Sequence, residues 1–444
     1  MYEGDSNLSD MRSLWTDTVS AEAQHLLSED AHWFFHQALS TPCLQGVSSA
    51  QGIYLTDSDG HRVMDFHGNN VHQIGYGHPR VLDAVWQQLQ VLPFVPRRYT
   101  NAAAIALARQ LSTLAPINEG KVLLVPGAAE AVSIALKVAR AVTGRYKTLS
   151  FYGSFHGATL DALSVGGQQD FTTGLGPLLP GSLHTQGFSP GQCAFGCGGH
   201  CHLGCLQSVE QILRQEGDVG LVLLETIRNT DVRIPPTEYY TELRAICHQH
   251  GALLAVDETA IAWGRTGKMF AVEHFGIRPD IIIVGKGLGA GVYPLAAAII
   301  AGEWDHVPER SLGHFTFEKS PVGAVAALTM ITVVEEEHLL QRAHDLGAYF
   351  VQLLNSLRSH HAAVDDIRQV GLLIAVDIVH PHTHQPWAVG AEEILYECLK
   401  GGLNFKVSEG SILSLTPALI ITTAQLDRAV EILHTALTIA ENSL

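Results

Sequence analysis

The stretch LLAVDETAIAWGRTGKMFAVEHFGIRPDIIIVGKGLGAGVYPLAA, residues 253–297, contains two short apolar runs that each lead to a charged side chain. The runs LLAV and IIIV are shorter than a buried helix, and the second is made of β-branched residues, so both predict strands. Asp257 ends the first run, and Lys286 follows the second after one glycine. A lone charge at the end of a buried strand is costly, so both residues require a partner.

The same pattern extends over most of the chain. The runs KVLLVP, TLSFYG and GLVLLE also predict strands, and helical stretches such as Ala129 to Arg140 and Thr237 to His250 alternate with them. This alternation is typical of an α/β fold with a mostly parallel, doubly wound sheet. Ligands of such sheets bind beyond the carboxyl ends of the strands. Four residues stand at those ends here: Gly127, Glu225, Asp257 and Lys286.

The chain divides into three predicted parts. Residues 1–60 form an N-terminal arm and hairpin, with an amphipathic helix around Glu22 to Leu39 and alternating residues in GIYLTDSDGHRVMDF around Asp59-Gly60. Residues 61–320 hold the strand and helix alternation and form the large domain. Residues 321–444 begin with one long helix pattern and form a smaller C-terminal α+β domain.

Composition restricts the partners of the protein. A formal net charge of −17 over 444 residues argues against nucleic acid, because nucleic-acid binding requires basic patches. The start MYEGDSNLSD has no basic and apolar leader pattern, and the apolar runs are too short to cross a membrane, so we expect a cytoplasmic protein without a membrane partner. Seven cysteines, an odd number, favour free thiols over a disulfide framework.

One cofactor meets the requirements of both strand ends. Pyridoxal phosphate needs a lysine amine for its Schiff base and an acid that keeps its ring nitrogen protonated. Its phosphate needs N–H donors, which the strand, the Gly127 turn and the helix of VLLVPGAAEAVSIALKVAR supply. An ordinary salt bridge between Asp257 and Lys286 accounts for the same two residues equally well.

The stretch 253–297 resembles the signature of the class III (ω-amino acid) aminotransferase family of fold type I pyridoxal phosphate enzymes. The resemblance continues through GYGHPRVLDAV, PGAAEAVSIALKVAR, SFHGAT, LLETI, HFTFEKSPVGAVAAL and LTPALIIT, so it covers nearly the whole chain after about Gly52. It implies pyridoxal 5'-phosphate as the cofactor and a homodimer whose active sites are shared between the subunits.

The resemblance also implies roles for single residues. Lys286 would be the Schiff-base lysine and the base that moves protons, and Asp257 would be the partner of the pyridine nitrogen. Phe155 would stack on the cofactor ring, although core packing is an alternative role for it. The other cofactor-binding residues implied are Gly127, Ala128, Ala129, His156, Glu225 and, from the other subunit, Thr316.

Departures from the family pattern bear on the reaction. Ala128 and Ala129 stand where a hydroxyl is usual, Thr226 and Ala260 replace the usual proline and glutamine, and Ser414 stands where the family usually has an arginine. That arginine clamps a substrate carboxylate through its bidentate geometry. A transaminase binds two carboxylate substrates in turn, whereas a lyase needs one substrate and no such clamp.

We therefore interpret the chain as a pyridoxal-phosphate-dependent lyase of a small amino(hydroxy)alkyl phosphonate, a chemistry that the family includes. The specific prediction is conversion of (R)-1-hydroxy-2-aminoethylphosphonate to phosphonoacetaldehyde and ammonia. A class III ω-aminotransferase that moves an amino group from a primary amine to a 2-oxoacid is the alternative, and a non-catalytic or metal-binding relative is a more remote one. The substrate-binding residues predicted for the phosphonate are Arg97, Arg98, Arg228, Asn69 and Asn70, with salt bridges as an alternative role for each arginine.

The stretch CAFGCGGHCHLGC, residues 193–205, places four cysteines at intervals of four residues, with His200 and His202 between them. Structural zinc sites use these residue types but usually separate two cysteine pairs by a dozen or more residues. Bound zinc, a reducible disulfide and free thiols therefore all stay open for Cys193, Cys197, Cys201 and Cys205. We predict no metal in the active site, because the pyridoxal phosphate residues account for the chemistry.

Overall fold

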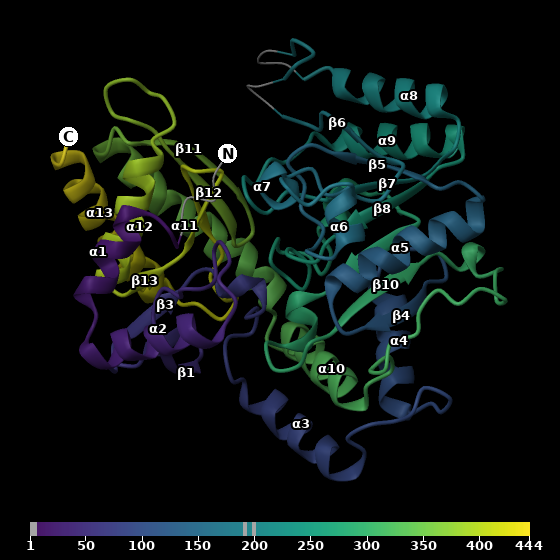
Figure 1. Ribbon diagram of the computed structural model, residues 1–444, viewed down its shortest axis with the longest axis horizontal. Helices are drawn as coiled ribbons and strands as arrows, with labels where there is room; N and C mark the ends of the chain where they lie inside the picture. The colour runs from purple at the N-terminus through teal and green to yellow at the C-terminus, as the bar shows by residue number, and fades with distance from the viewer. Residues whose placement is uncertain (1–6, 190–192, 198–200) are drawn as a thin grey trace.

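A computed structural model describes residues 7–189, 193–197 and 201–444. At its centre lies a seven-stranded sheet with the order β4-β10-β9-β8-β7-β5-β6 (Figure 1). Only β10 runs against its neighbours β4 and β9, so the predicted mostly parallel sheet is confirmed. The strands are β4 (Lys121–Val125), β5 (Lys147–Phe151), β6 (Ser182–Thr185), β7 (Val219–Glu225), β8 (Leu253–Asp257), β9 (Ile281–Val284) and β10 (Ala296–Ile300).

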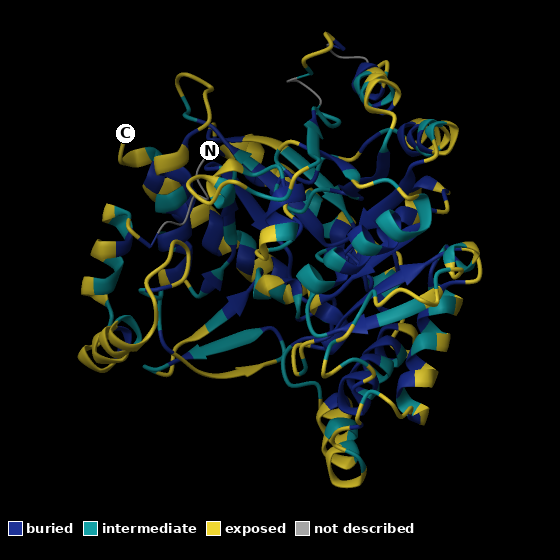
Figure 2. Cartoon of the chain, turned by 45° about the vertical axis from the view of Figure 1, so that its right-hand side comes forward, coloured by how far each residue is buried: buried dark blue, intermediate teal, exposed yellow. Residues whose placement is uncertain are grey.

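Helices cover both faces of this sheet. Along β8, Leu253 and Ala255 pack with helix α5, whereas Leu254 and Val256 belong to the larger core on the opposite face, as the alternation of side chains in a strand requires. Burial on both faces explains why the strands are continuously apolar, and they form the buried centre of Figure 2. The helices of this part are α3 (Pro79–Val91), α4 (Ala102–Leu114), α5 (Ala128–Thr143), α6 (Leu160–Val165), α7 (Gln169–Thr172), α8 (Gly204–Glu216), α9 (Thr237–His250) and α10 (Pro321–Glu336).

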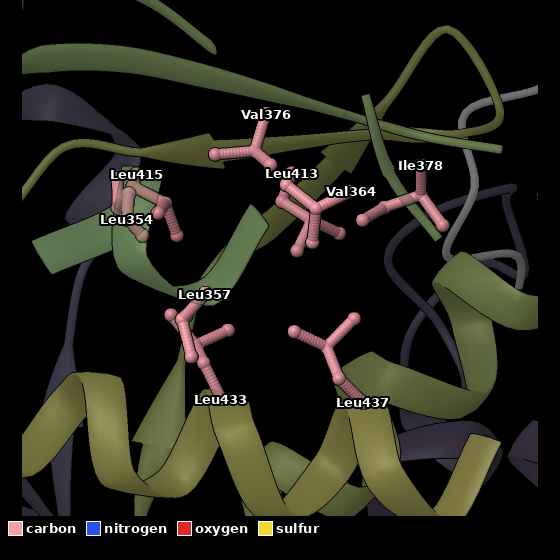
Figure 3. Close-up of a pocket in the computed structure, with 9 residues that line it drawn as sticks. All are labelled: Leu354, Leu357, Val364, Val376, Ile378, Leu413, Leu415, Leu433 and Leu437. Carbon is pink, nitrogen blue, oxygen red and sulfur yellow. The ribbon is translucent and has the colours of Figure 1, made fainter. Parts of the chain in front are cut away.

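The C-terminal part has its own four-stranded sheet, with the order β11-β12-β15-β14. Helices α11 and α13 pack against it, and Figure 3 shows leucines from both helices facing Val364, Val376 and Ile378 of the sheet. The elements are α11 (Leu339–His360), β11 (Val364–Val370), β12 (Leu373–Ile378), α12 (Ala388–Lys400), β14 (Lys406–Ser408), β15 (Ile412–Leu415) and α13 (Thr423–Asn442).

A third sheet ties the N-terminal segment to the C-terminal part. Strand β3 pairs in parallel with β13, and helix α1 contacts α12. The two ends of the chain therefore pack together, as the left side of Figure 1 shows. The elements are α1 (Asp10–Thr18), α2 (Ala21–Trp33), β1 (Val47–Gln51), β2 (Tyr54–Asp57), β3 (Arg62–Asp65) and β13 (Leu403–Asn404).

Most predicted elements form where the sequence places them, with three differences. The predicted hairpin is confirmed by the antiparallel pair β2 and β3. The helix expected around Glu22 to Leu39 ends at Trp33, and the long pattern after Pro321 is two helices, broken where His338 adopts a φ of 52°. Strands β6 and β10 were not predicted, and the domain bounds at residues 60 and 320 stay a prediction. In the ranges that the structure covers, no helix has both the length and the apolar character that crossing a membrane requires.

Candidate active site

Three reactive side chains meet at the carboxyl edge of the central sheet. Strands β7 and β8 pair in a register that sets Glu225 opposite Asp257. Strand β9 is the next neighbour of β8, and Lys286 follows its end, as the first residue of the 3-10 helix η3 (Lys286–Gly289). Lys286 has a φ of 44°, a backbone conformation that non-glycine residues rarely adopt. The register of three parallel strands thus collects two carboxylates and one amine at one edge.

Asp257 is held as a carboxylate. Its side chain is 5% exposed, Oδ2 lies 2.9 Å from His156 Nδ1, and Oδ1 accepts a hydrogen bond from the Thr259 backbone N–H at 3.0 Å. Burial by itself would raise the pKa of Asp257, but the hydrogen bond and charge of His156 outweigh it and lower that pKa. The adjacent Glu225 differs, because burial raises its pKa and the charge of Asp257 adds to the rise.

The surroundings of Lys286 disfavour the protonated, charged form of its amine. Its side chain remains accessible at the open edge of the sheet, but the surrounding protein replaces much of its solvent and lowers its pKa. The positive charge of Lys406 lowers the pKa of Lys286 further, whereas Asp257 and Glu225 oppose this effect. A lysine with a depressed pKa supplies the neutral amine that nucleophilic and basic roles require.

The loop before helix α5 forms a small cradle for an anion. Gly127 caps this helix with no side-chain hydrogen bond, so the first N–H groups of a 16-residue helix are not used by a capping side chain. A Cβ on Gly157 would lie 2.7 Å from Ala129 Cβ, and a Cβ on Gly285 would lie 3.1 Å from Ala128 Cβ. Small residues are therefore required at Gly157 and Gly285 beside this turn, whereas the Glu130 carboxylate lies next to Gly127 itself.

These residues fit pyridoxal phosphate, the cofactor that the family resemblance implies. One buried polar atom beside Asp257, His156 Nε2, has no hydrogen-bond partner among the residues that the structure describes. The cofactor's requirements are met by a lysine whose charge is disfavoured, a carboxylate held ionised and a helix start without a side-chain cap. The ring of Phe155 is half-exposed. Phe155 is further linked to the site because its N–H donates to Glu225 Oε1 at 3.1 Å.

On the substrate side, the predicted pair Asn69 and Asn70 lies close to Lys286, because the short helix η1 (Gly68–Asn70) packs on η3. Asn70 is 1% exposed, and its Nδ2 donates to Asn229 Oδ1 at 3.3 Å. Within the described part of the chain, Asn70 Oδ1 accepts no hydrogen bond, which leaves a buried acceptor for a ligand donor. Asn69 is exposed.

The predicted arginines have different surroundings. Arg228 pairs with both carboxylate oxygens of Asp231, donates to the Gly153 carbonyl and lies 3.7 Å from Glu409, so acids already balance its charge. It borders a cleft of about 760 Å³ that opens between Glu225 and the C-terminal sheet. Its role in binding a phosphonate stays a prediction, with Asp231 as a competing partner.

Arg97, Arg98 and Thr316 belong to two loops that pack on each other. Phe94 and Phe317 stack edge to face with ring centroids 5.4 Å apart, and Asn101 donates to the Lys319 carbonyl at 2.9 Å. Arg98 and Thr316 are exposed. The predicted roles of these three residues toward a partner subunit's site stay predictions.

Two basic groups near Lys286 were missed by sequence reasoning. His67 precedes η1, and Lys406 lies opposite Ser414 in the pair β14 and β15. Burial lowers the pKa of His67 to about 4, and the charges of Lys406 and Lys286 contribute to this. The one sequence signal for Lys406 was its position shortly before Ser414. The sequence alone does not show that the strands of these two residues pair with each other.

The described residues of the cysteine stretch before α8, 193–197 and 201–203, have no helix or strand, and Cys205 lies in the first turn of α8. Cys197 Sγ lies 3.8 Å from His202 Nε2, and none of the four cysteines is joined by a disulfide in the described ranges. Residues 198–200, which include His200, lie outside the described residues. In the described ranges, only Asp57, Asp59 and His61 bring three potential ligand atoms within 4.8 Å of one another.

Comparison with known proteins gives the family. Residues 36–437 match the family described as Aminotransferase class-III. A (R)-1-hydroxy-2-aminoethylphosphonate ammonia-lyase from Vibrio splendidus (strain 12B01) is 39% identical over 98% of this chain and 94% of its own length. A 5-aminovalerate aminotransferase from Pseudomonas putida is 32% identical over 87% of this chain and 92% of its own length.

Solved structures agree in fold. A Bacillus anthracis aminotransferase superposes with a TM-score of 0.87 at 25% identity and covers 95% of this chain and 100% of its own. The taurine:2-oxoglutarate aminotransferase of Bifidobacterium kashiwanohense, solved with pyridoxal phosphate and glutamate, gives a TM-score of 0.86 at 25% identity over 95% of this chain and 99% of its own. With its sheet order, strand-end residues and these matches, the chain belongs to the class III aminotransferase family of fold type I.

Proposed function

We propose that this protein is a pyridoxal-phosphate-dependent ammonia-lyase that converts (R)-1-hydroxy-2-aminoethylphosphonate to phosphonoacetaldehyde and ammonia. The ammonia-lyase from Vibrio splendidus, similar over almost the full length of both chains, supports this substrate. The observation that carries the proposal is Ser414, which is 2% exposed and lies 3.0 Å from Ser408 Oγ and 3.3 Å from the Thr230 carbonyl. A small neutral side chain here offers no bidentate clamp for the carboxylate of a 2-oxoacid, which a transaminase would need.

Each strand-end residue has a part in this reaction. Pyridoxal phosphate, when bound through Lys286 Nζ, supplies a ring that accepts the electron pair of the breaking C–H bond. Asp257, held ionised by His156, keeps a proton on the ring nitrogen. When the cofactor is bound, the start of α5 would hold its phosphate through backbone N–H groups. Lys286, with its lowered pKa, removes the proton from the carbon that carries the amine.

The overall change balances without a second substrate. The proton leaves the amine-bearing carbon, and hydroxide leaves the neighbouring carbon that carries phosphorus. The resulting enamine takes up water and gives phosphonoacetaldehyde and ammonia, so the water lost in elimination is regained in hydrolysis. One carbon is oxidised and its neighbour is reduced, which means that no external oxidant or 2-oxoacid takes part.

Exposed side chains and net charge support proposals for the oligomeric state, partners and location of the enzyme. A homodimer is supported by exposed apolar side chains on α3 and on the two packed loops: Leu82, Trp86, Val91, Tyr99 and Phe317. A net charge of −17 favours a small-molecule substrate and neither nucleic acid nor a membrane as partner. We infer a cytoplasmic enzyme of phosphonate catabolism.

The test is the requirement for a 2-oxoacid. Purified holoenzyme is incubated with (R)-1-hydroxy-2-aminoethylphosphonate alone, and ammonia and phosphonoacetaldehyde are measured. The proposal expects both products in equal amounts and no stimulation by pyruvate or 2-oxoglutarate. Turnover that appears only after a 2-oxoacid is added would instead identify an aminotransferase.

A further inference from the structure

Glu225 differs from the other acids around the site because it has no cation beside it. Within the described residues, no lysine, arginine or histidine nitrogen lies within 4.0 Å of its carboxylate. Two backbone N–H groups hold this carboxylate instead: Phe155 donates to Oε1 at 3.1 Å, and Asn229 donates to Oε2 at 3.3 Å. The orientation of Glu225 is therefore fixed without an ion pair.

The cleft of about 760 Å³ is lined by Glu225 and by four other acids. One of them, Asp365, is exposed to solvent. The other three each lie within 4.0 Å of an arginine nitrogen, which favours the ionised form of a carboxylate: Asp231, Asp377 and Glu409. At the strand ends, Asp257 is held ionised by His156. Among these acids, Glu225 is the one suited to hold a proton and give it away.

Strand geometry places Glu225 and Lys286 on two sides of one site. Glu225 ends β7, Lys286 follows β9, and β8 lies between these two strands. Neighbouring strands are about 4.8 Å apart, so the two backbones are separated by a distance on the order of 10 Å. This separation leaves room for a two-carbon substrate between the two side chains.

A chain of contacts connects the two residues. Asn229, whose N–H holds Glu225, also accepts a hydrogen bond through its Oδ1 from Asn70 Nδ2 at 3.3 Å. The Asn70 carbonyl accepts a hydrogen bond from Gln73 Nε2 at 3.0 Å. Gln73 packs against the backbone that follows Lys286, since a Cβ on the next glycine would lie 2.0 Å from Gln73 Oε1. The positions of Glu225 and Lys286 are thus coupled through side chains that line the same site.

Electrostatics agree with this arrangement. Burial raises the pKa of Glu225 and the charge of Asp257 adds to the rise, while the charges of His156 and Arg228 act in the opposite direction without cancelling it. Reduced solvation lowers the pKa of Lys286. Both shifts move the pair toward a neutral acid and a neutral amine, the forms that give and take a proton.

The proposed reaction needs both functions. Lys286 takes the proton of the carbon that carries the amine. The neighbouring carbon must then lose its hydroxyl group, and hydroxide is a poor leaving group unless an acid protonates it as the bond breaks. An acid on the other side of the substrate from Lys286 can supply that proton.

We propose that Glu225 is the catalytic acid that protonates the leaving hydroxyl group of the substrate. This inference rests on the proposed function for the identity of the leaving group. As the C–O bond breaks, its electron pair stays on oxygen, the Glu225 proton joins it, and water leaves. The electron pair of the former C–H bond becomes the new C=C bond. Net transfer of one proton from Lys286 to Glu225 restores both groups, so no further reactant is consumed.

The test varies the leaving group. Ammonia release from (R)-1-hydroxy-2-aminoethylphosphonate and fluoride release from its 1-fluoro analogue are measured with holoenzyme of the wild type, Glu225→Gln, Glu225→Asp and Glu441→Gln. Glu441 of α13 is the matched control, because its carboxylate also accepts a backbone N–H, from Ala363 at 2.8 Å, but does not line the cleft.

The two leaving groups should respond differently. Glu225→Gln should lower kcat for the hydroxy substrate about 10²- to 10⁴-fold, the range for a lost general acid. Fluoride leaves without being protonated, so its release should stay within about tenfold of the wild type. Glu225→Asp keeps an acid and should retain more activity on the hydroxy substrate than Glu225→Gln, and Glu441→Gln should match the wild type.

Two further readouts separate an acid from a residue that only maintains the fold. Glu225→Gln should still exchange the C–H protons beside the amine of 2-aminoethylphosphonate for deuterium, because Lys286 performs that step and this analogue has no leaving group. Wild-type kcat should fall as the pH rises through the pKa of Glu225. An infrared band of a protonated carboxylic acid, missing from Glu225→Gln, should disappear over the same pH range.

The outcomes distinguish the inference from the proposed function. Equal losses of ammonia and fluoride release in Glu225→Gln, or a loss of deuterium exchange, would give Glu225 a structural role and overturn the inference. Wild-type ammonia release by Glu225→Gln would overturn the inference alone. A wild type that releases no ammonia without a 2-oxoacid would overturn the proposed function and the inference with it.

Discussion

The strand-end site and the cysteine loop are both rich in reactive side chains, but they are assembled differently. At the strand ends, Glu225 ends β7, Asp257 ends β8 and Lys286 follows β9, and the pairing of these three strands sets their positions. In the cysteine stretch, Cys193 to Cys205 lie within thirteen residues of the sequence, and Cys197 Sγ lies 3.8 Å from His202 Nε2.

The difference shows that closeness in sequence does not by itself make a site. A buried sheet fixes side chains that are distant in sequence. Reduced solvation then lowers the pKa of Lys286, whereas burial would raise the pKa of Asp257 and the hydrogen bond and charge of His156 lower it instead. A loop must instead use its own backbone to bring ligands together, and a bound metal or a disulfide would stabilise such an arrangement. The experiments below treat the two regions in matched pairs.

The largest expected effect is the loss of the amine at the strand end. Lys286→Ala removes both the covalent attachment point and the base, so kcat for ammonia release should fall by at least about 10³-fold. Cys197→Ser, its counterpart in the loop, should keep kcat within about twofold. Steady-state ammonia assays on both variants decide this. A Lys286→Ala enzyme with wild-type activity, or a Cys197→Ser enzyme without any, would reverse the assignment of the two regions.

The next effect compares two buried aspartates. Asp257→Asn keeps the shape but removes the charge that maintains a proton on the ring nitrogen, so kcat should fall by about 10²- to 10³-fold. Asp280 is 1% exposed, precedes β9 and pairs with Arg244 at 2.9 Å, which makes it the structural control. Asp280→Asn should lower the melting temperature with little change in kcat. Similar kinetic losses in both variants would mean that Asp257 has only a structural role.

A smaller effect distinguishes the packing of the two regions. A Cβ on Gly287 would lie 2.0 Å from Gln73 Oε1, and Gln73 is buried and donates to the Asn70 carbonyl. Gly287→Ala should cost ~1–3 kcal/mol in the free energy of unfolding and reduce activity by displacing Asn70. Gly196 has open space around it and a φ of 69°, so Gly196→Ala should cost ~1 kcal/mol and leave activity unchanged. Chemical denaturation and ammonia assays test both; equal activity in the two variants would contradict the tight packing at Gly287.

The smallest effect concerns the thiols and leaves catalysis unchanged. Hydrogen bonds from the backbone of His202 and from Cys193 lower the pKa of Cys197 to about 7, whereas burial raises the pKa of Cys205 to about 11. Because the thiolate is the reactive form, alkylation of Cys197 by iodoacetamide should increase about tenfold from pH 6 to pH 8, while Cys205 stays unreactive. Peptide mass spectrometry follows each site. Protection of Cys197 that a chelator or a reductant removes would identify zinc or a disulfide instead.

The strand-end residues could be predicted because their signal is local. A short apolar run that ends in Asp257 or Lys286 indicates both the strand and the edge on which its last residue lies. Two other contacts could not be predicted from the sequence. His156 and Asp257 are about one hundred positions apart in the chain. Lys406 and Ser414 are paired by a strand register that only the fold reveals. The break at His338 was missed because the apolar pattern continues through it, and only packing reveals the positive φ.

The most direct test of the strand-end assignment is to trap the cofactor on the chain. Holoenzyme is reduced with borohydride and digested, and the peptide that carries the reduced cofactor is sequenced by mass spectrometry. The account predicts a single modified residue, Lys286, and loss of the visible absorbance band. Modification of Lys406 or another lysine in its place, or no modification of an active enzyme, would contradict it.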